Sequence, residues 1–169
     1  MKEISNLLVI LFILLLIASC KENNNENEKF YYKDYQPNIE VLSYDSVYID
    51  LDDDDKDDIK ANVNTSAIII TSNSNIQIYC GTQNSASLTP VKENDVIDNS
   101  MVWTNTTHGL LGLLGSEYET YIAFKFSKEN NGYYGWIKII FNDSTLYIDK
   151  YAYNKIASEP ILAGQLLSY

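Results

Sequence analysis

Short runs in which apolar and polar residues alternate dominate this sequence after residue 41, and they limit the folds open to the chain. In a β-strand, successive side chains point to opposite faces, so each run offers one apolar face to a core. The clearest runs cover 47–51, 59–63, 76–80, 122–126, 133–141 and 146–153, with a short apolar stretch at 67–70. No segment after residue 20 has the period of an amphipathic helix. The pattern therefore predicts an all-β chain folded as a single antiparallel β-sandwich or jelly-roll-like domain.

Turn-forming residues separate several of these runs. Asn131-Gly132 is expected to form a hairpin turn, because both residues tolerate a positive φ. Asn142-Asp143-Ser144 predicts a second turn. The stretch 81–105 is polar and irregular, with Pro90 in its middle, and we expect it to loop over the surface.

The apolar run from Leu7 to Ile17 belongs to a different kind of segment. At about 1.5 Å per residue it covers only about half of a hydrocarbon core roughly 30 Å thick, which is too short for a transmembrane helix. Together with Lys2 it follows the plan of a secretory signal peptide. Ile17-Ala18-Ser19-Cys20 resembles the bacterial lipobox, so we expect residues 1–19 to be a signal peptide that is removed.

The resemblance to bacterial lipoproteins implies that Cys20 carries the lipid. In that class the thiol takes a diacylglycerol and the new amino group is acylated, with palmitate a typical chain. Two or three chains anchor firmly, because each buried CH₂ adds about 0.8 kcal/mol. The alternative is an ordinary secretory signal followed by an unrelated cysteine.

The residues after Cys20 bear on where the anchored protein lies. Lys21 stands where an aspartate would resemble an inner-membrane retention signal, which favours the outer membrane. The charged Lys21-Glu22 pair resembles the tether of lipoproteins that face the cell exterior. We therefore expect a lipidated cysteine and flexible polar tether over 20–35, followed by the β-sandwich domain over 36–169.

Composition excludes several classes of function. The net charge of -11 argues against a nucleic-acid partner, because neutralising phosphates requires Lys and Arg. If Cys20 is lipidated, Cys80 has no disulfide partner, and its place at the end of an apolar alternation predicts a buried small residue. His108 is the single histidine, which removes most zinc and Ser-His mechanisms.

An acidic loop between two predicted strands is the motif with recognisable chemistry. A calcium loop offers side-chain oxygens at positions 1, 3, 5 and 9 and a backbone carbonyl at position 7. Counting from the first aspartate, these positions are Asp50, Asp52, Asp54 and Asp58, with the carbonyl of Lys56. The spacing predicts a Ca²⁺ site with these five ligands.

Two positions depart from the full EF-hand pattern. Asp55 replaces the usual glycine at position 6, although aspartate is among the few other residues that tolerate the left-handed conformation. Ala61 replaces the glutamate at position 12, so the site is a shorter form completed by water or a distant oxygen. We expect a structural role and a Kd on the order of 10⁻⁴–10⁻³ M.

The alternative to a metal site is a solvated acidic turn. Seven aspartates fall within the nine residues 50–58, and strands abut them on both sides. Like charges about 5 Å apart cost near 1 kcal/mol per pair even in water, so this crowding favours a bound cation.

Several short segments together resemble a small exported β-domain known from PEP-CTERM-sorted exoproteins. The matching pieces are 50–52, 58–59, 121–126, 134–136, 151–153 and 160–165. The resemblance implies a β-sandwich with unassigned biochemistry, and it supplies no catalytic residues. The PEP-CTERM anchor is absent from this sequence, and the lipid on Cys20 would replace it.

These features favour a non-enzymatic, membrane-anchored lipoprotein with a binding or structural role at the cell envelope. Its partners would be the bilayer and a surface protein or glycan. Two alternatives stay open: a small glycan-active hydrolase that uses a carboxylate pair, and an accessory subunit of an envelope complex. Trp103 and Trp136 would either stack on sugar rings or pack in the core. The stretch 109–115 is expected to be a flexible loop against the core, with an exposed docking patch as the alternative.

Overall fold

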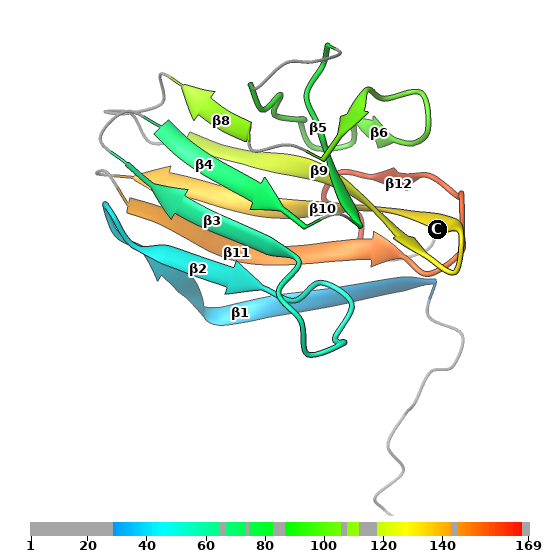
Figure 1. Cartoon of the computed structure of the whole chain (residues 1–169), viewed down its shortest axis with the longest axis horizontal. Helices are drawn as coiled ribbons and strands as arrows, with labels where there is room; N and C mark the ends of the chain where they lie inside the picture. Colours follow the sequence, from blue (N-terminus) through cyan, green and yellow to red (C-terminus); the bar gives the residue numbers. More distant parts are fainter. Residues whose placement is uncertain are drawn as a thin grey trace, which may run out of the picture.

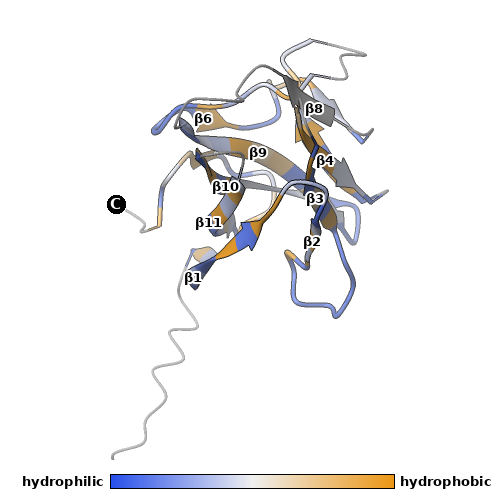
Figure 2. Ribbon diagram, turned by 90° about the vertical axis from the view of Figure 1, so that its left-hand side faces the viewer, coloured by the Kyte–Doolittle hydropathy of each residue, from blue (hydrophilic) through white to orange (hydrophobic). Residues whose placement is uncertain are grey.

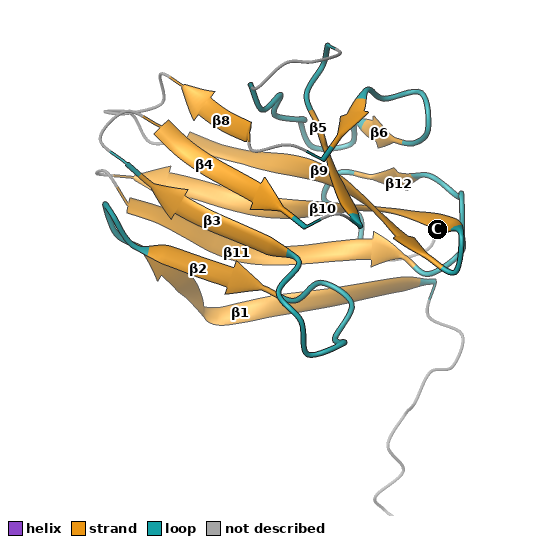
Figure 3. Ribbon diagram, in the orientation of Figure 1, coloured by secondary structure: helices purple, strands orange, loops and turns teal. Residues whose placement is uncertain are grey.

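The computed structural model describes residues 29–64, 67–73, 75–82, 87–105, 108–111, 118–142 and 145–166. These residues form β-strands and loops, and no helix occurs among them (Figure 3). The all-β class predicted from the alternation is therefore confirmed. No helix in this part of the chain is long and apolar enough to cross a membrane. The predicted signal peptide at 1–19 and the predicted lipid site at Cys20 lie outside the described residues.

Two antiparallel sheets make up most of the structure (Figure 1). The larger has the order β1 (Phe30–Val41), β11 (Thr145–Asn154), β10 (Asn131–Asn142), β9 (Tyr118–Lys128), β5 (Ile76–Tyr79), β7 (Trp103–Thr104). The smaller has the order β2 (Ser46–Ile49), β3 (Ile59–Val63), β4 (Ala67–Ser72), β8 (His108–Leu111). Two further short strands, β6 (Val96–Ile97) and β12 (Ile161–Leu162), pair with each other. The smaller sheet lies over the larger as a separate layer, which gives a β-sandwich (Figure 2).

The main core fills the space between the two sheets. Strand β3 shows its basis most clearly, because Ile59, Ala61 and Val63 are buried while the residues between them are half-buried. Ile122, Phe124 and Phe126 of β9 enter the same core from the larger sheet. The period-two pattern read from the sequence therefore identifies the inward face of these strands.

A second core covers the opposite face of the larger sheet. Tyr121 and Ala123 of β9 and Trp136 of β10 point to this side, where Ile97 and Ile161 pack against them. Strands β9 and β10 are thus buried on both faces, which explains their nearly continuous apolar sequence.

The folded domain begins earlier than expected. Residue 36 was the predicted boundary between tether and domain, but β1 already starts at Phe30, which is buried in the second core. Tyr31 also packs against the main core. The sequence placed the start of the folded domain only between Phe30 and Val41, because residues 31–35 are tyrosines and charged residues without a clear alternation, although the segment pairs with β11.

Two predicted loops contain strands. The stretch 81–105 carries the two-residue strands β6 and β7, and its Leu88, Val91 and Ile97 are buried. The prediction of a surface loop was wrong because Val91 and Ile97 of this stretch pack in the second core. In the predicted loop 109–115, Gly109 to Leu111 belong to the edge strand β8, and the remaining residues lie outside the described chain.

The hairpin between β9 and β10 turns at Glu129 and Asn130 rather than at Asn131-Gly132. Both turn residues have positive φ, 53° and 66°, and Asn131 already pairs with Lys128. This register places Gly135 opposite Phe124, and the Phe124 ring occupies the space a side chain would need. Packing of that ring fixes the register, which the turn sequence alone did not reveal.

Replacing Gly135 by alanine should destabilise the domain strongly. The new Cβ would lie 2.6 Å from the carbonyl oxygen of Ala152 and would overlap the Phe124 ring. Overpacking of this kind costs about 1–3 kcal/mol. The matched control is Gly132→Ala, whose Cβ would meet the flexible end of Lys125. Urea denaturation measures both, and equal midpoints for the two variants would show that the close packing is not limiting.

Candidate metal centre

The acidic loop connects β2 to β3 and projects from one end of the sandwich (Figure 1). Its neck is closed by the pairing of Ile49 with Ile59 and by the Asp58 N–H, which donates to the carbonyl of Ile49 at 2.9 Å. Leu51 is fully buried in the main core and holds the start of the loop. The fold therefore fixes both ends of the loop, while the aspartates between them stay near solvent.

Three of the predicted ligands converge. Asp50, Asp52 and Asp58 each offer a carboxylate oxygen, and these oxygens all lie within 4.8 Å of one another. Oxygens bound to one Ca²⁺ at about 2.3–2.6 Å can be no more than about 4.6–5.2 Å apart, so the spacing fits a common ion. This three-carboxylate cluster could in principle hold a metal ion.

Asp58 is the most buried member of the three-carboxylate cluster, at 8% exposure. One of its oxygens accepts the Leu51 N–H at 2.9 Å, and the other accepts the Asn73 side-chain amide at 2.8 Å. Burial nevertheless raises the pKa of Asp58, because the two hydrogen bonds do not fully offset the lost hydration, and the charges of Asp52 and Asp50 raise it further. A cation beside Asp58 would relieve the same penalty.

Asp50 shapes the loop. Its two carboxylate oxygens accept the backbone N–H of Asp55 at 2.9 Å and that of Asp54 at 3.3 Å. Asp55 has a φ of 62°, as expected for the position where a glycine is usual, and Asp53 has a φ of 54°. A carboxylate has about four lone-pair sites, so these bonds leave capacity for a cation.

Asp54 and Lys56 pair with each other. The Lys56 ammonium lies 2.6 Å from one Asp54 oxygen, and the Lys56 N–H donates to the other at 3.0 Å. The side-chain bond from Lys56 is the main reason that the pKa of Asp54 lies below its usual value. Asp54 is therefore not part of the three-carboxylate cluster, although it lines the adjacent hollow. The backbone carbonyl of Lys56 stays a predicted ligand.

The larger sheet supports the loop through contacts that sequence reasoning missed. The Tyr151 hydroxyl donates to the Asp50 carbonyl at 3.0 Å, across a long separation in sequence. Tyr31 and Lys33 of β1 both donate to Asp53, and these bonds lower the pKa of Asp53. The local sequence does not identify Tyr31, Lys33 and Tyr151 as contacts of the loop, because they come near it only through the pairing of distant strands.

A β-bulge puts Tyr151 in reach. Lys138 of β10 pairs with Lys150, whereas the next residue, Ile139, pairs with Ile148, so Asp149 is an extra residue in β11. In a regular strand Tyr151, three residues after Ile148, would face the opposite side of the sheet, whereas the bulge places both on the side of the main core. The bulge therefore directs the hydroxyl toward the loop.

The hollow beside the cluster has a volume of about 80 Å³ and is also lined by Asn73 and Phe126. Ligand pockets for organic molecules usually measure roughly 300–1,000 Å³, so this hollow suits an ion and its waters better than a sugar. Lys128 lies 3.6 Å from Asp52 and adds one positive charge at the rim. Together with Lys33 and Lys56 it only partly balances the seven aspartates.

The other candidates from the sequence lie elsewhere. Trp136 is fully buried in the second core, whereas Trp103 is half-buried at its margin. Cys80 is buried, as predicted, and its thiol donates to the Thr82 carbonyl. His108 is the first residue of β8.

Comparison with known protein families, curated proteins and solved structures finds no match to this chain. The geometry of the residues themselves therefore carries the functional interpretation. The strongest geometric feature is the three-carboxylate cluster, because it unites positions that the sequence separates by up to eight residues.

The raised pKa of Asp58 predicts a pH-dependent stability in the absence of metal. A raised folded-state pKa means that the contribution of Asp58 is greatest below its ordinary value of 3.8 and is lost as the pH rises through the raised value. In chelator, the free energy of unfolding of the wild type should therefore fall relative to that of Asp58→Asn between about pH 3.5 and about pH 7. Urea denaturation across this range measures the difference.

Asp57→Asn is the control for this experiment, because Asp57 is the exposed neighbour in the same loop. It removes one carboxylate charge from the loop without touching the three-carboxylate cluster. A pH-independent difference for Asp58→Asn would show that the buried carboxylate carries no penalty.

Proposed function

We propose that this protein is a membrane-anchored, calcium-stabilised β-sandwich lipoprotein with a binding or structural role at the cell envelope. The observation that carries the calcium part is the convergence of Asp50, Asp52 and Asp58 within 4.8 Å. Each stands at a position where a calcium loop has an oxygen ligand. A site of three carboxylates suits a hard cation such as Ca²⁺, which it would bind with moderate affinity.

The proposed role of the ion is structural. The cluster lies where the β2–β3 hairpin meets β11, since Tyr151 bonds to Asp50. A cation would hold three carboxylates that otherwise repel one another, and it would stabilise the native state by mass action. The unfolded chain lacks this arrangement of oxygens, so binding and folding are coupled.

The proposed location rests on the resemblance of residues 17–20 to the lipobox and on the polar segment that follows. The first strand begins at Phe30, so a short segment separates the proposed lipid on Cys20 from the domain. Lys21 favours the outer membrane, with the domain facing the cell exterior. The resemblance to exported β-domains of PEP-CTERM-sorted exoproteins supports export of the domain.

Calcium should raise the melting temperature of the protein. For a Kd of 10⁻⁴–10⁻³ M, about 10 mM Ca²⁺ adds roughly 1.4–2.7 kcal/mol, or about 3–10 °C, relative to chelator. Asp52→Asn should lose most of this shift, whereas the matched loop variant Asp57→Asn should keep it. Mg²⁺ should give a smaller shift, because it needs a near-ideal octahedral site. An equal shift in wild type and Asp52→Asn would contradict the assignment.

Cys20→Ser should release the protein from the membrane. Without the thiol no diacylglycerol can attach, so the protein should move to the soluble fraction and should no longer incorporate labelled palmitate. Cys80→Ala is the control, because the buried Cys80 is not a lipidation candidate and its loss should leave fractionation and labelling unchanged. A labelled, membrane-bound Cys20→Ser variant would place the anchor elsewhere.

A further inference from the structure

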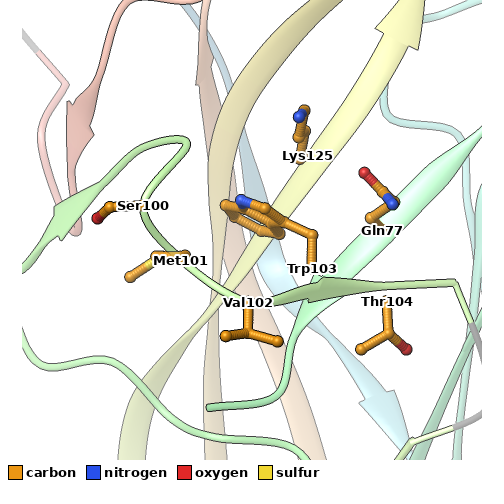
Figure 4. A pocket seen from close by; sticks show the side chains of 7 residues that line it. All are labelled: Gln77, Ser100, Met101, Val102, Trp103, Thr104 and Lys125. Atoms are coloured by element: carbon orange, nitrogen blue, oxygen red, sulfur yellow. The ribbon is translucent and has the colours of Figure 1, made fainter. Parts of the chain in front are cut away.

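A second depression lies over β5, β7 and β9 of the larger sheet and shares no lining residue with the hollow beside the acidic loop (Figure 4). It measures about 590 Å³, within the usual range of roughly 300–1,000 Å³ for ligand pockets. Its lining includes Gln77, Ser100, Met101, Trp103, Thr104 and Lys125. The Trp103 ring lies at the centre, with Lys125 and Gln77 to one side and Ser100 and Met101 to the other.

The strand register explains why polar residues line this depression. Gln77 of β5, Lys125 of β9 and Tyr134 of β10 are direct partners in neighbouring strands, so they form one row across the sheet. Trp103 covers Tyr134, but Gln77 and Lys125 remain only half-buried. The residues that pack over the second core thus end at Trp103. Gln77 and Lys125 therefore stay partly accessible beside the Trp103 ring.

Trp103 is held in one orientation. Its indole N–H donates to the carbonyl of Asp98 at 3.1 Å. The ring stacks on Tyr134 with centroids 5.9 Å apart and meets the edge of Tyr79 at 6.4 Å. Because three contacts already fix the Trp103 ring, stacking of a ligand on it would cost little side-chain entropy.

Lys125 gives the depression a positive charge. Its ammonium donates to the Asn99 side-chain oxygen at 3.2 Å and lies 5.7 Å from the centre of the Tyr134 ring. None of the ion pairs among the described residues includes Lys125. The nearby Asp98 is occupied, since its carboxylate accepts the N–H and the hydroxyl of Ser100 at 2.7 and 2.6 Å.

Among the described residues no carboxylate lines the depression, although the chain has a net charge of -11. A lysine without an acidic partner is complementary to an anionic ligand group. A fixed indole beside an amide suits a ring that has an apolar face and a polar rim. A saccharide that carries a carboxylate meets all of these requirements.

We propose that this depression is a binding subsite for an acidic saccharide, with a uronic-acid ring stacked on Trp103 and its carboxylate bound by Lys125. The Gln77 amide lies to one side of the Trp103 ring, where it would bond ring hydroxyls. The inference deepens the proposed binding role at the envelope and rests on it for the source of the glycan. Its residues are separate from those of the calcium loop.

Isothermal titration of the full chain in detergent tests this proposal. Oligogalacturonate is the acidic probe, and a neutral malto-oligosaccharide of equal length is its uncharged counterpart. Polyglutamate tests whether carboxylate charge alone is sufficient for binding. Oligothymidylate tests whether a stacked base with a phosphate binds as well. We expect oligogalacturonate to bind at least ten-fold more tightly than each of the others.

Trp103→Ala should weaken oligogalacturonate binding at least ten-fold. Lys125→Gln should remove the preference over the neutral sugar, whereas Lys92→Gln, an exposed lysine outside the depression, should not. A melting curve for each variant checks folding, and Lys125→Gln keeps the test decisive if Trp103→Ala unfolds. No binding of oligogalacturonate, equal binding of any other probe, or unaffected Lys125→Gln would overturn the proposal.

Titrations with Ca²⁺ and with chelator separate the two proposals. Loss of the calcium-dependent melting shift with saccharide binding intact would refute only the calcium proposal. An intact shift without saccharide binding would refute only the saccharide proposal.

Discussion

Strands β9 and β10 bury apolar side chains on both of their faces. Each face therefore has to be packed against another layer of the structure. On one side Phe124 and Ile137 need the smaller sheet as a partner. On the other side Trp136 needs a cover, which the short strands β6 and β12 and the residues around them supply. Burial on both faces thus accounts for a sandwich with an added layer. Only residues beyond the covered parts of the sheet stay accessible to a ligand.

The acidic loop is largely held in shape by the protein itself. Asp50 accepts two backbone N–H groups, Asp58 joins Leu51 to Asn73, and Tyr151 ties the loop to the larger sheet. A cation would therefore enter an arrangement that already exists, and its main effect would be electrostatic. It would offset the desolvation of Asp58 and the mutual repulsion of the carboxylates, with little ordering of the chain required.

The strands and the centre of the loop were predictable because their signals are local. Alternation identified β3, and the tolerance of aspartate for positive φ identified Asp55. The signals that failed depend on distant partners. The extra residue Asp149 reverses the facing of Tyr151, and nothing near either residue reveals it. Asp54 is a local case: it fits the ligand spacing, but it pairs with Lys56 two residues away and lies outside the three-carboxylate cluster.

Strand β9 links the two proposed sites while keeping them chemically separate. Phe126 points into the main core and lines the hollow beside the acidic loop, whereas the preceding residue, Lys125, points to the outer face and lines the second depression. Because adjacent residues of a strand face opposite sides, one strand borders both sites while the Lys125 charge lies on the face away from the hollow that Phe126 lines. The same alternation that builds the core therefore also distributes charge between two faces, so an anionic ligand and a cation can each find a complementary surface.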